Sequence, residues 1–181
     1  MIRKLVTSAA VLALSASSLS AFANPLDGDG GEIRFEGKIV EKTCTVAVNG
    51  TVTPAVATVT LPETNAGLLK FAGNTAGDTP FKISLKDCRT NASSADVYFT
   101  SAQLDGNQLK NIAPLQDAAG NVALQLTDDA GIPLDLSGKT PTSMPLNAGS
   151  GDATYKVSYY AKSAVTPGAV VSTAMYIVGY P

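Results

Sequence analysis

Short apolar runs, each ended by turn-forming residues, restrict the folds that this chain can adopt. The runs are rich in Val, Ile, Thr and Tyr, and stretches such as AGNTAGDTP, DDAGIP and TPGA separate them. Helical periodicity of useful length is absent, apart from one turn around residues 65–71. Short strands at this spacing predict an all-β antiparallel sandwich. The strands are predicted at Ile33–Val48, Ala57–Leu61, Phe81–Leu85, Asp96–Thr100, Val122–Leu126, Thr154–Ala161 and Val170–Tyr180.

The first residues form a secretory signal peptide rather than part of the fold. Arg3 and Lys4 supply the positive charge, Leu5–Leu19 the apolar stretch, and Ala21–Ala23 a small-residue cleavage site. An N-terminal membrane anchor is the alternative, but the apolar run is too short to span a bilayer. We therefore expect residues 1–23 to be removed on export. The remaining 158 residues are enough for one domain with a sizeable core.

The mature chain lacks the charge that would attract nucleic acid or an anionic membrane. Loss of Arg3 and Lys4 with the signal peptide changes the formal net charge from −2 to −4, and no lysine- or arginine-rich run follows. No later run of about 18 apolar residues is present either. We expect no nucleic-acid partner and no transmembrane segment in the mature chain.

Cys44 and Cys88 are the only cysteines, and such a pair after an export signal is most simply a disulfide. Closing this loop would stabilise the fold by about 4 kcal/mol on the chain-entropy model. A reactive thiol pair is the alternative, but the sequence has neither C-x-x-C spacing nor a histidine base. An immunoglobulin domain proper is excluded, because tryptophan is absent and the disulfide begins at the first strand.

The sequence contains few residue patterns typical of a catalytic site or a metal site. Without histidine, Ser–His and Cys–His nucleophiles and His-based zinc sites are excluded. DLSGKT ends like a phosphate-binding loop, but Pro133 stands where the pattern requires glycine. LDGDGGE lacks the ligands of a calcium loop, and the paired acids Asp128 and Asp129 lie in the turn-like DDAGIP. We expect no catalytic residue, no metal and no cofactor.

Residues 31–39 alternate with a period of two, which predicts a half-buried strand. Charged residues occupy one face, and the other face holds Gly31, Ile33, Phe35, Gly37 and Ile39. Glycine weakens a strand interior unless another surface comes very close. This strand is therefore poorly suited to fill a core of its own domain. An ordinary edge strand of the chain's own sheet is the alternative interpretation.

The last predicted strand, VVSTAMYIVGYP, is apolar on both faces and runs to the final residue. One face holds Ala174, Tyr176, Val178 and Tyr180, and Gly168 lies in the preceding TPGA turn. A strand apolar on both faces should be buried in a sheet. The chain nevertheless ends without a segment to cover the next edge.

These features together resemble the major pilins of chaperone–usher fimbriae, close to the type 1 fimbrial subunits. The matching motifs are the signal peptide, GEIRFEGKIV followed by EKTC, the second cysteine in LKDC, and a C-terminal pattern. In that pattern Gly168 is the fourteenth residue from the end and Tyr180 is next to last. The resemblance covers the mature chain from end to end.

The resemblance implies an incomplete immunoglobulin-like antiparallel sandwich that lacks its last strand. It implies an N-terminal donor-strand extension at residues 24–40 and a pilin domain at residues 41–181. In this family a groove beside the C-terminal strand accepts a chaperone strand, and later the extension of a neighbouring subunit. The implied groove residues are Gly168, Ala174, Tyr176, Val178 and Tyr180. The implied donor residues are Gly31, Ile33, Phe35, Gly37 and Ile39, with Gly37 fitting a shallow pocket.

The resemblance also implies a place and a set of partners. The subunit would pass through the periplasm and polymerise into an adhesive fimbria on the bacterial surface. Its partners would be identical or related pilin subunits, a periplasmic chaperone and an outer-membrane usher. Two other functions stay open, namely a minor or adaptor pilin and a secreted monomeric carbohydrate-binding sandwich. The latter would require surface aromatics for sugar stacking, whereas most aromatics here lie in strand-like positions.

Overall fold

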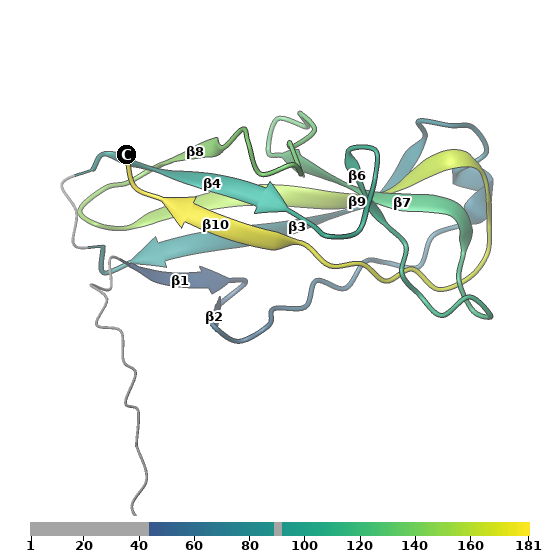
Figure 1. Ribbon diagram of the computed structural model, residues 1–181, viewed down its shortest axis with the longest axis horizontal. Coiled ribbons are helices and arrows are strands. Elements are labelled where there is room, and N and C mark those ends of the chain that lie inside the picture. Colours follow the sequence, from purple (N-terminus) through teal and green to yellow (C-terminus); the bar gives the residue numbers. More distant parts are fainter. Residues whose placement is uncertain (1–43, 89–91) are drawn as a thin grey trace, which may run out of the picture. The chain divides into compact units, whose positions relative to one another are not determined.

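Two antiparallel sheets hold nearly all of the regular structure in the computed structural model, which describes residues 44–88 and 92–181 (Figure 1). The larger sheet has the strand order β2-β1-β3-β9-β7-β6-β5. Its strands are β1 (Thr45–Val48), β2 (Thr51–Val52), β3 (Thr75–Lys86), β5 (Leu104–Asp105), β6 (Gln108–Lys110), β7 (Gly120–Asp128) and β9 (Gly151–Thr166). The smaller sheet has the order β10-β4-β8 and comprises β4 (Ser94–Thr100), β8 (Thr142–Pro145) and β10 (Met175–Gly179). Within the described residues the only helical element is the 3₁₀ turn η1 (Ala66–Leu68).

The hydrophobic core lies between the sheets, and alternate residues of the long strands supply it. Ile83 and Leu85 of β3 and Val97 of β4 are almost fully buried. Burial of each such side chain contributes about 1.5–3 kcal/mol. Phe99 of β4 meets Tyr155 of β9 edge to face with ring centroids 4.9 Å apart, so aromatic contacts join the two layers. The prediction of an all-β antiparallel sandwich is confirmed.

Most predicted strands are present, and the long ones exceed their predicted bounds. The predictions at Phe81–Leu85, Asp96–Thr100, Val122–Leu126 and Thr154–Ala161 fall within β3, β4, β7 and β9, and η1 lies in the predicted helical turn. The strands β2, β5, β6 and β8 were not predicted, because they are too short to display a period. Of the prediction at Ile33–Val48, only Thr45–Val48 is a described strand, and the rest up to residue 43 lies outside the described residues.

The strand predicted at Ala57–Leu61 is not formed, although the segment keeps a strand-like alternation. Ala57, Val59 and Leu61 are half-buried against the core, and the residues between them are exposed. Among the described residues, no backbone hydrogen bond joins residues 56–61 to another segment. The alternation correctly indicates a face turned to the core. A β-strand also requires a neighbouring backbone, which this segment lacks in the described structure.

A disulfide joins Cys44, immediately before β1, to Cys88, shortly after β3. β1 and β3 are paired neighbours, with Thr45 opposite Lys86. The bond therefore fastens the end of this two-strand ladder within one sheet, unlike the inter-sheet disulfide of an antibody domain. The disulfide predicted from the cysteine pair is present.

Reduction of this disulfide should lower the melting temperature of the exported protein by about 10 °C. The loss follows from about 4 kcal/mol of chain-entropy stabilisation for a loop of this length. Thermal unfolding followed by circular dichroism, with and without reductant, measures the shift. Because the chain has only two cysteines, the Cys44→Ser, Cys88→Ser double variant is the control and should not respond to reductant. Two free thiols in the exported protein, detected by mass spectrometry, would contradict the prediction.

Candidate functional site

The last strand, β10, presents one apolar face to the core and another to the surface. Tyr176, Val178 and the following Tyr180 are half-buried and pack against the hydrophobic core. Met175 and Ile177 alternate with them and are 58% and 62% exposed. The prediction that this strand is buried in a sheet is therefore wrong for its outer face. The predicted bounds, Val170–Tyr180, also shrink to Met175–Gly179.

β10 lies at the edge of the smaller sheet, which explains this exposure. It pairs with β4 from Met175 opposite Thr100 to Gly179 opposite Asp96. The sheet order places no described strand on its other side. An edge strand leaves backbone N–H and C=O groups available to another strand. The free edge of β10 is the first element of the candidate site.

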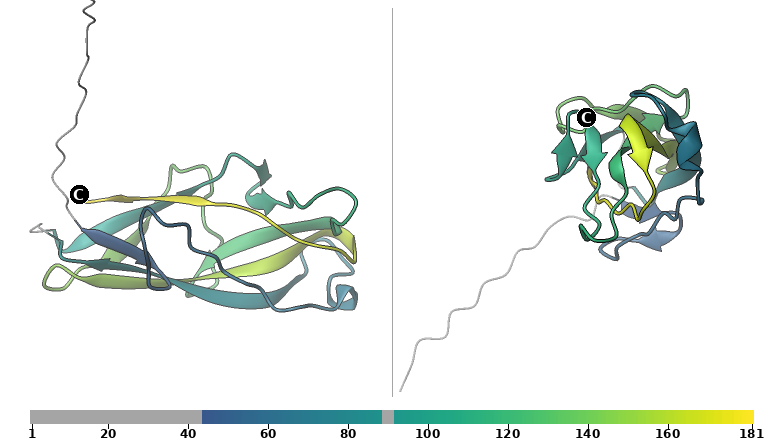
Figure 2. Two further views of the ribbon diagram at one scale, coloured as in Figure 1. Left: turned by 90° about the horizontal axis from the view of Figure 1, so that it is seen from below. Right: turned by 90° about the vertical axis from the view of Figure 1, so that its right-hand side faces the viewer.

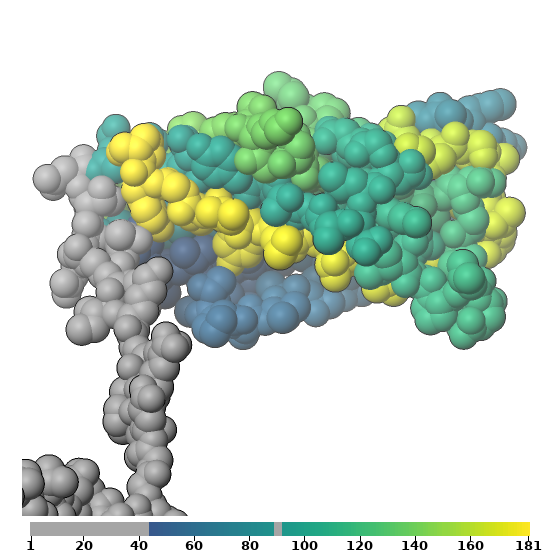
Figure 3. Space-filling model, in the orientation of Figure 1, coloured from purple at the N-terminus to yellow at the C-terminus, as the bar shows by residue number. Residues whose placement is uncertain are grey.

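The 57–61 segment supplies the second element. Its inward residues, Ala57, Val59 and Leu61, belong to the same half-buried apolar layer as Tyr176 and Val178. In Figure 3 the yellow β10 and the blue segment that follows β2 border a hollow on one face of the molecule, with β1 deeper between them. Figure 2 shows the same two segments from below. We call this depression between β10 and the 57–61 segment the edge groove; Tyr176, Val178 and Tyr180 form the half-buried, inward face at its β10 side.

A cavity of about 700 Å³ lies where both walls of the edge groove continue. Residues 63–66, which follow the 57–61 segment, line one side, and residues 165–170, which precede β10, line the other. Leu69, Val122 and Tyr159 also contact it. We call it the end cavity. The end cavity has a mixed lining, in which Glu63, Thr64, Asn65 and Thr166 accompany the apolar residues.

The structure explains why position 168 requires glycine, beyond its place in the predicted turn. A Cβ atom at this position would lie 2.5 Å from the carbonyl carbon and 2.7 Å from the carbonyl oxygen of Ala118. Real side chains do not approach a backbone so closely, so only glycine allows the chain to cross here. Gly168 thus brings residues 165–170 against residues 118–119 at the wall of the end cavity.

The hydroxyl of Tyr176 is buried without a hydrogen-bond partner among the described residues. Burial raises the pKa of this phenol. A buried hydroxyl without a partner costs free energy, and native cores rarely contain one. This hydroxyl belongs to the inward row of β10, beside the edge groove.

The predicted groove residues differ in burial and in position relative to β10. Tyr176, Val178 and Tyr180 share the half-buried face, whereas Ala174 lies before β10 and is exposed. The five predicted donor residues, from Gly31 to Ile39, lie outside the described residues. The sequence analysis missed the part played by the 57–61 segment and by the end cavity. The alternation of Ala57, Val59 and Leu61 was the available signal.

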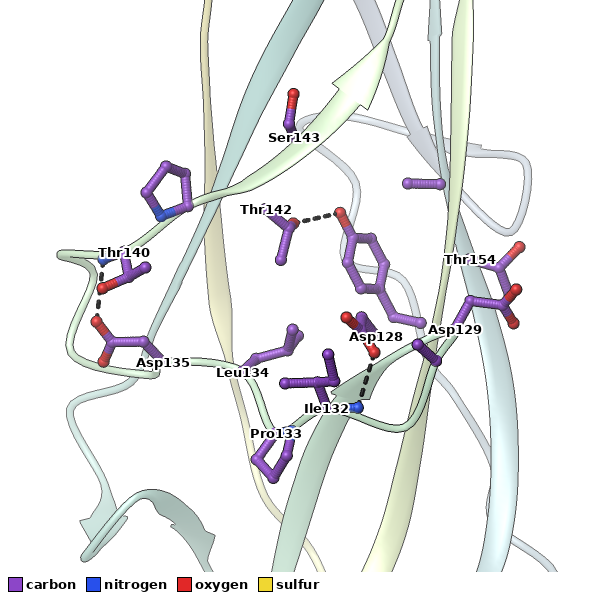
Figure 4. Close-up of a pocket in the computed structure, with 14 residues that line it drawn as sticks. Asp128, Asp129, Ile132, Pro133, Leu134, Asp135, Thr140, Thr142, Ser143 and Thr154 are labelled. Atoms are coloured by element: carbon purple, nitrogen blue, oxygen red, sulfur yellow. Dashed lines mark hydrogen bonds between the residues drawn. The ribbon is translucent and has the colours of Figure 1, made fainter.

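A second hollow, of about 720 Å³, contains the paired acids that the sequence drew attention to (Figure 4). Asp128 accepts the backbone N–H of Ile132 at 2.8 Å, and Asp135 accepts those of Ser137 and Thr140 at 2.8 and 3.0 Å. Hydrogen bonds from Ser137 and Thr140 lower the pKa of Asp135 well below its usual range. Figure 4 shows the hydrogen bonds of Asp128 with Ile132 and of Asp135 with Thr140, both between the end of β7 and the start of β8. These carboxylates organise turns.

Residues 44–88 and 92–181 contain neither a candidate metal site nor a candidate membrane-spanning helix. No group of three or more His, Cys, Asp or Glu side chains could hold a metal ion. Nor does any helix there have the length and apolar character needed to cross a membrane.

Comparison with known proteins gives consistent results. Residues 33–181 match the sequence model of the fimbrial protein family. The type-1 fimbrial protein A chain of Escherichia coli K12 is 36% identical over 173 residues, which cover 93% of each chain. A type I fimbria protein of Burkholderia pseudomallei has a crystal structure that aligns with a TM-score of 0.56 at 32% identity, over 78% of this chain and 91% of that one. The P pilus rod subunit PapA shares the fold, with a TM-score of 0.61 at 17% identity over 77% of this chain and 100% of its own.

An incomplete antiparallel sandwich in which an apolar strand has one edge free of a described neighbour is the structural class of the pilins. The chain belongs to the fimbrial protein family, whose members are subunits of pili on the cell surface.

Proposed function

We propose that this chain is a structural subunit that polymerises into an adhesive fimbria by donor-strand exchange. The edge groove of one copy accepts residues 31–39 of the next copy as the missing strand of its sandwich. The observation that carries the proposal is the free edge of β10 beside an apolar layer that is only half-buried. Addition of a strand to an exposed sheet edge is an established mode of peptide recognition.

The two walls of the edge groove suit a strand with a period of two. Such a strand would pair with β10 along its backbone, and its alternate side chains would enter the groove between β10 and the 57–61 segment. Ile33, Phe35 and Ile39 would each contribute about 1.5–3 kcal/mol by burial. Each new backbone hydrogen bond would add about 0.5–1.5 kcal/mol. This accounts for a strand, residues 31–39, that serves its own domain poorly.

The same geometry supports a need for assembly partners. An unfilled groove exposes apolar surface together with an unpaired edge, which is a predicted aggregation site. A periplasmic chaperone that lends a strand would cover both during transit, and an outer-membrane usher would exchange it for the incoming subunit. In this proposal the extension, residues 24–40, is the donor. The pilin domain, residues 41–181, is the acceptor.

Expression of the mature chain with and without a type 1 periplasmic chaperone tests the proposal. Alone, the chain should aggregate or be degraded, because its groove has no occupant. With the chaperone it should give a soluble one-to-one complex on size-exclusion chromatography. A version with residues 24–43 repeated after Pro181 through a flexible linker is the positive control and should be soluble alone. A stable, monodisperse monomer of the unmodified chain, as expected of a carbohydrate-binding sandwich, would contradict the proposal.

A further inference from the structure

The side-chain amide of Asn111 uses its full hydrogen-bonding capacity. Its Nδ2 donates to the carbonyl oxygens of Ala119 at 3.1 Å and Ala169 at 3.0 Å. Its Oδ1 accepts the backbone N–H groups of Ala113 at 3.1 Å and Val171 at 3.0 Å. A neutral amide has two donor hydrogens and two acceptor lone pairs, and all four are occupied here. One side chain therefore ties its own loop to two distant backbone segments.

The segments that Asn111 joins are otherwise held by few bonds. Residues 117–119 and 169 form a short parallel contact, in which Ala119 N donates to Ala169 O at 2.9 Å and Ala169 N to Asp117 O at 2.6 Å. Ile112 N donates to Val171 O at 2.8 Å. An isolated parallel pairing of this length has little stability of its own. The asparagine is the link common to both contacts.

We call the four hydrogen bonds of the Asn111 side chain the clamp. The clamp lies at the wall of the end cavity, a few residues before β10. Ala119, Gly168, Ala169 and Val170 line that cavity, and Val170 is half-buried against the core. We propose that Asn111 is a positioning residue for assembly. It holds residues 169–171 in place before the incoming strand arrives, so that the end of the edge groove is already shaped for it. The inference rests on the proposed function.

The physical reason is the cost of ordering a segment during binding. Beyond the clamp, side-chain hydroxyls hold the chain up to β10, with Ser172 Oγ donating to Lys110 O at 2.9 Å and Ser101 Oγ to Thr173 O at 2.8 Å. Without Asn111, only the backbone contacts of Ala169 and Val171 and the Ser172 hydroxyl would hold this wall, and the arriving strand would have to order it further. Ordering that accompanies binding lowers the rate of productive association.

The Asn111→Asp substitution tests the proposal, because aspartate keeps the two acceptors and removes both donors. The matched control is Asn107→Asp, since Asn107 likewise donates to one carbonyl (Leu134 O, 2.8 Å) and accepts one N–H (Leu136 N, 3.1 Å) away from the end cavity. Each mature chain is purified as its chaperone complex and mixed with a dye-labelled peptide of residues 24–40. We expect the Asn111 variant to take up the peptide about tenfold more slowly, which is within the range for the two hydrogen bonds that it loses. The control should match the wild type.

Other outcomes are equally informative. A lower melting temperature of the Asn111→Asp complex with a wild-type uptake rate would show a merely structural asparagine and overturn the inference. If that variant does not fold, hydrogen exchange on the wild-type complex decides. Protected amides at Ala113 and Val171 support the clamp, and unprotected ones overturn it. A wild-type complex that takes up no peptide refutes the proposed function itself, and the inference falls with it.

Discussion

A leucine at Gly37 is expected to abolish fibre growth while folding and chaperone binding remain intact. In the proposed donor strand, Gly37 faces the groove of the neighbouring copy at the one inward position between Phe35 and Ile39 where no side chain fills it. A leucine there would collide with the floor of the neighbour's groove, and overpacking of this kind costs about 1–3 kcal/mol at each junction. The acceptor part of the variant is untouched. Deletion of residues 24–36 should have the same outcome, chaperone-bound subunits that do not polymerise.

Lys38→Leu is the matched control, because the alternation predicts Lys38 on the opposite face of the donor strand. It introduces the same side chain one residue away and should leave fibre yield close to that of the wild type. The measurement compares the yield of chaperone complex with the yield of fibres for each variant. An ordinary edge strand of the chain's own sheet predicts the reverse, namely impaired folding of Gly37→Leu. Normal fibres from Gly37→Leu would show that the donor-strand assignment is wrong.

The long strands could be predicted from the sequence because their faces satisfy a local rule. Ile83 and Leu85 of β3 alternate with exposed or half-buried neighbours, and the buried layer that they enter belongs to the same chain. A period of two is then enough to indicate both the strand and the face it buries. The disulfide followed from the count and context of the cysteines alone.

β10 and the 57–61 segment could not be predicted in the same way. A run that is apolar on both faces, such as Met175–Gly179, usually indicates a central strand. Here one face stays exposed and one edge stays unpaired among the described residues. The 57–61 segment shows the converse, with alternating side chains but no paired backbone. Under the proposed function, a strand donated by a neighbouring copy would pair with the free edge of β10 and cover the 57–61 segment, which accounts for both patterns.

The clamp at Asn111 could not be predicted from the sequence, for a different reason. In KNIAPLQ it is one polar residue of a loop, and its hydrogen-bond partner Ala169 is 58 residues away. The need for glycine at position 168 likewise depends on the backbone of Ala118, which no local pattern indicates. Contacts between loops distant in sequence are set by tertiary geometry.

A charge on the inward face of β10 should prevent both chaperone capture and polymerisation. Val178 is half-buried against the core and borders the edge groove. In the Val178→Asp variant an incoming strand would enclose an unpaired carboxylate, at a cost of about 3 kcal/mol, which is roughly a hundredfold in affinity. We therefore expect no isolable chaperone complex and no fibres from this variant.

The adjacent residue provides the control that makes this test specific. Ile177 is 62% exposed on the outer face of the same strand, so Ile177→Asp places the same charge in water, one residue away. It should retain the chaperone complex, because the outer face does not border the edge groove. Affinity for the chaperone, measured by titration for both variants, separates a role of the inward face from a general loss of strand propensity. Equal losses for Val178→Asp and Ile177→Asp would contradict a groove on the inner side of β10, because a strand that pairs and packs there distinguishes the two faces.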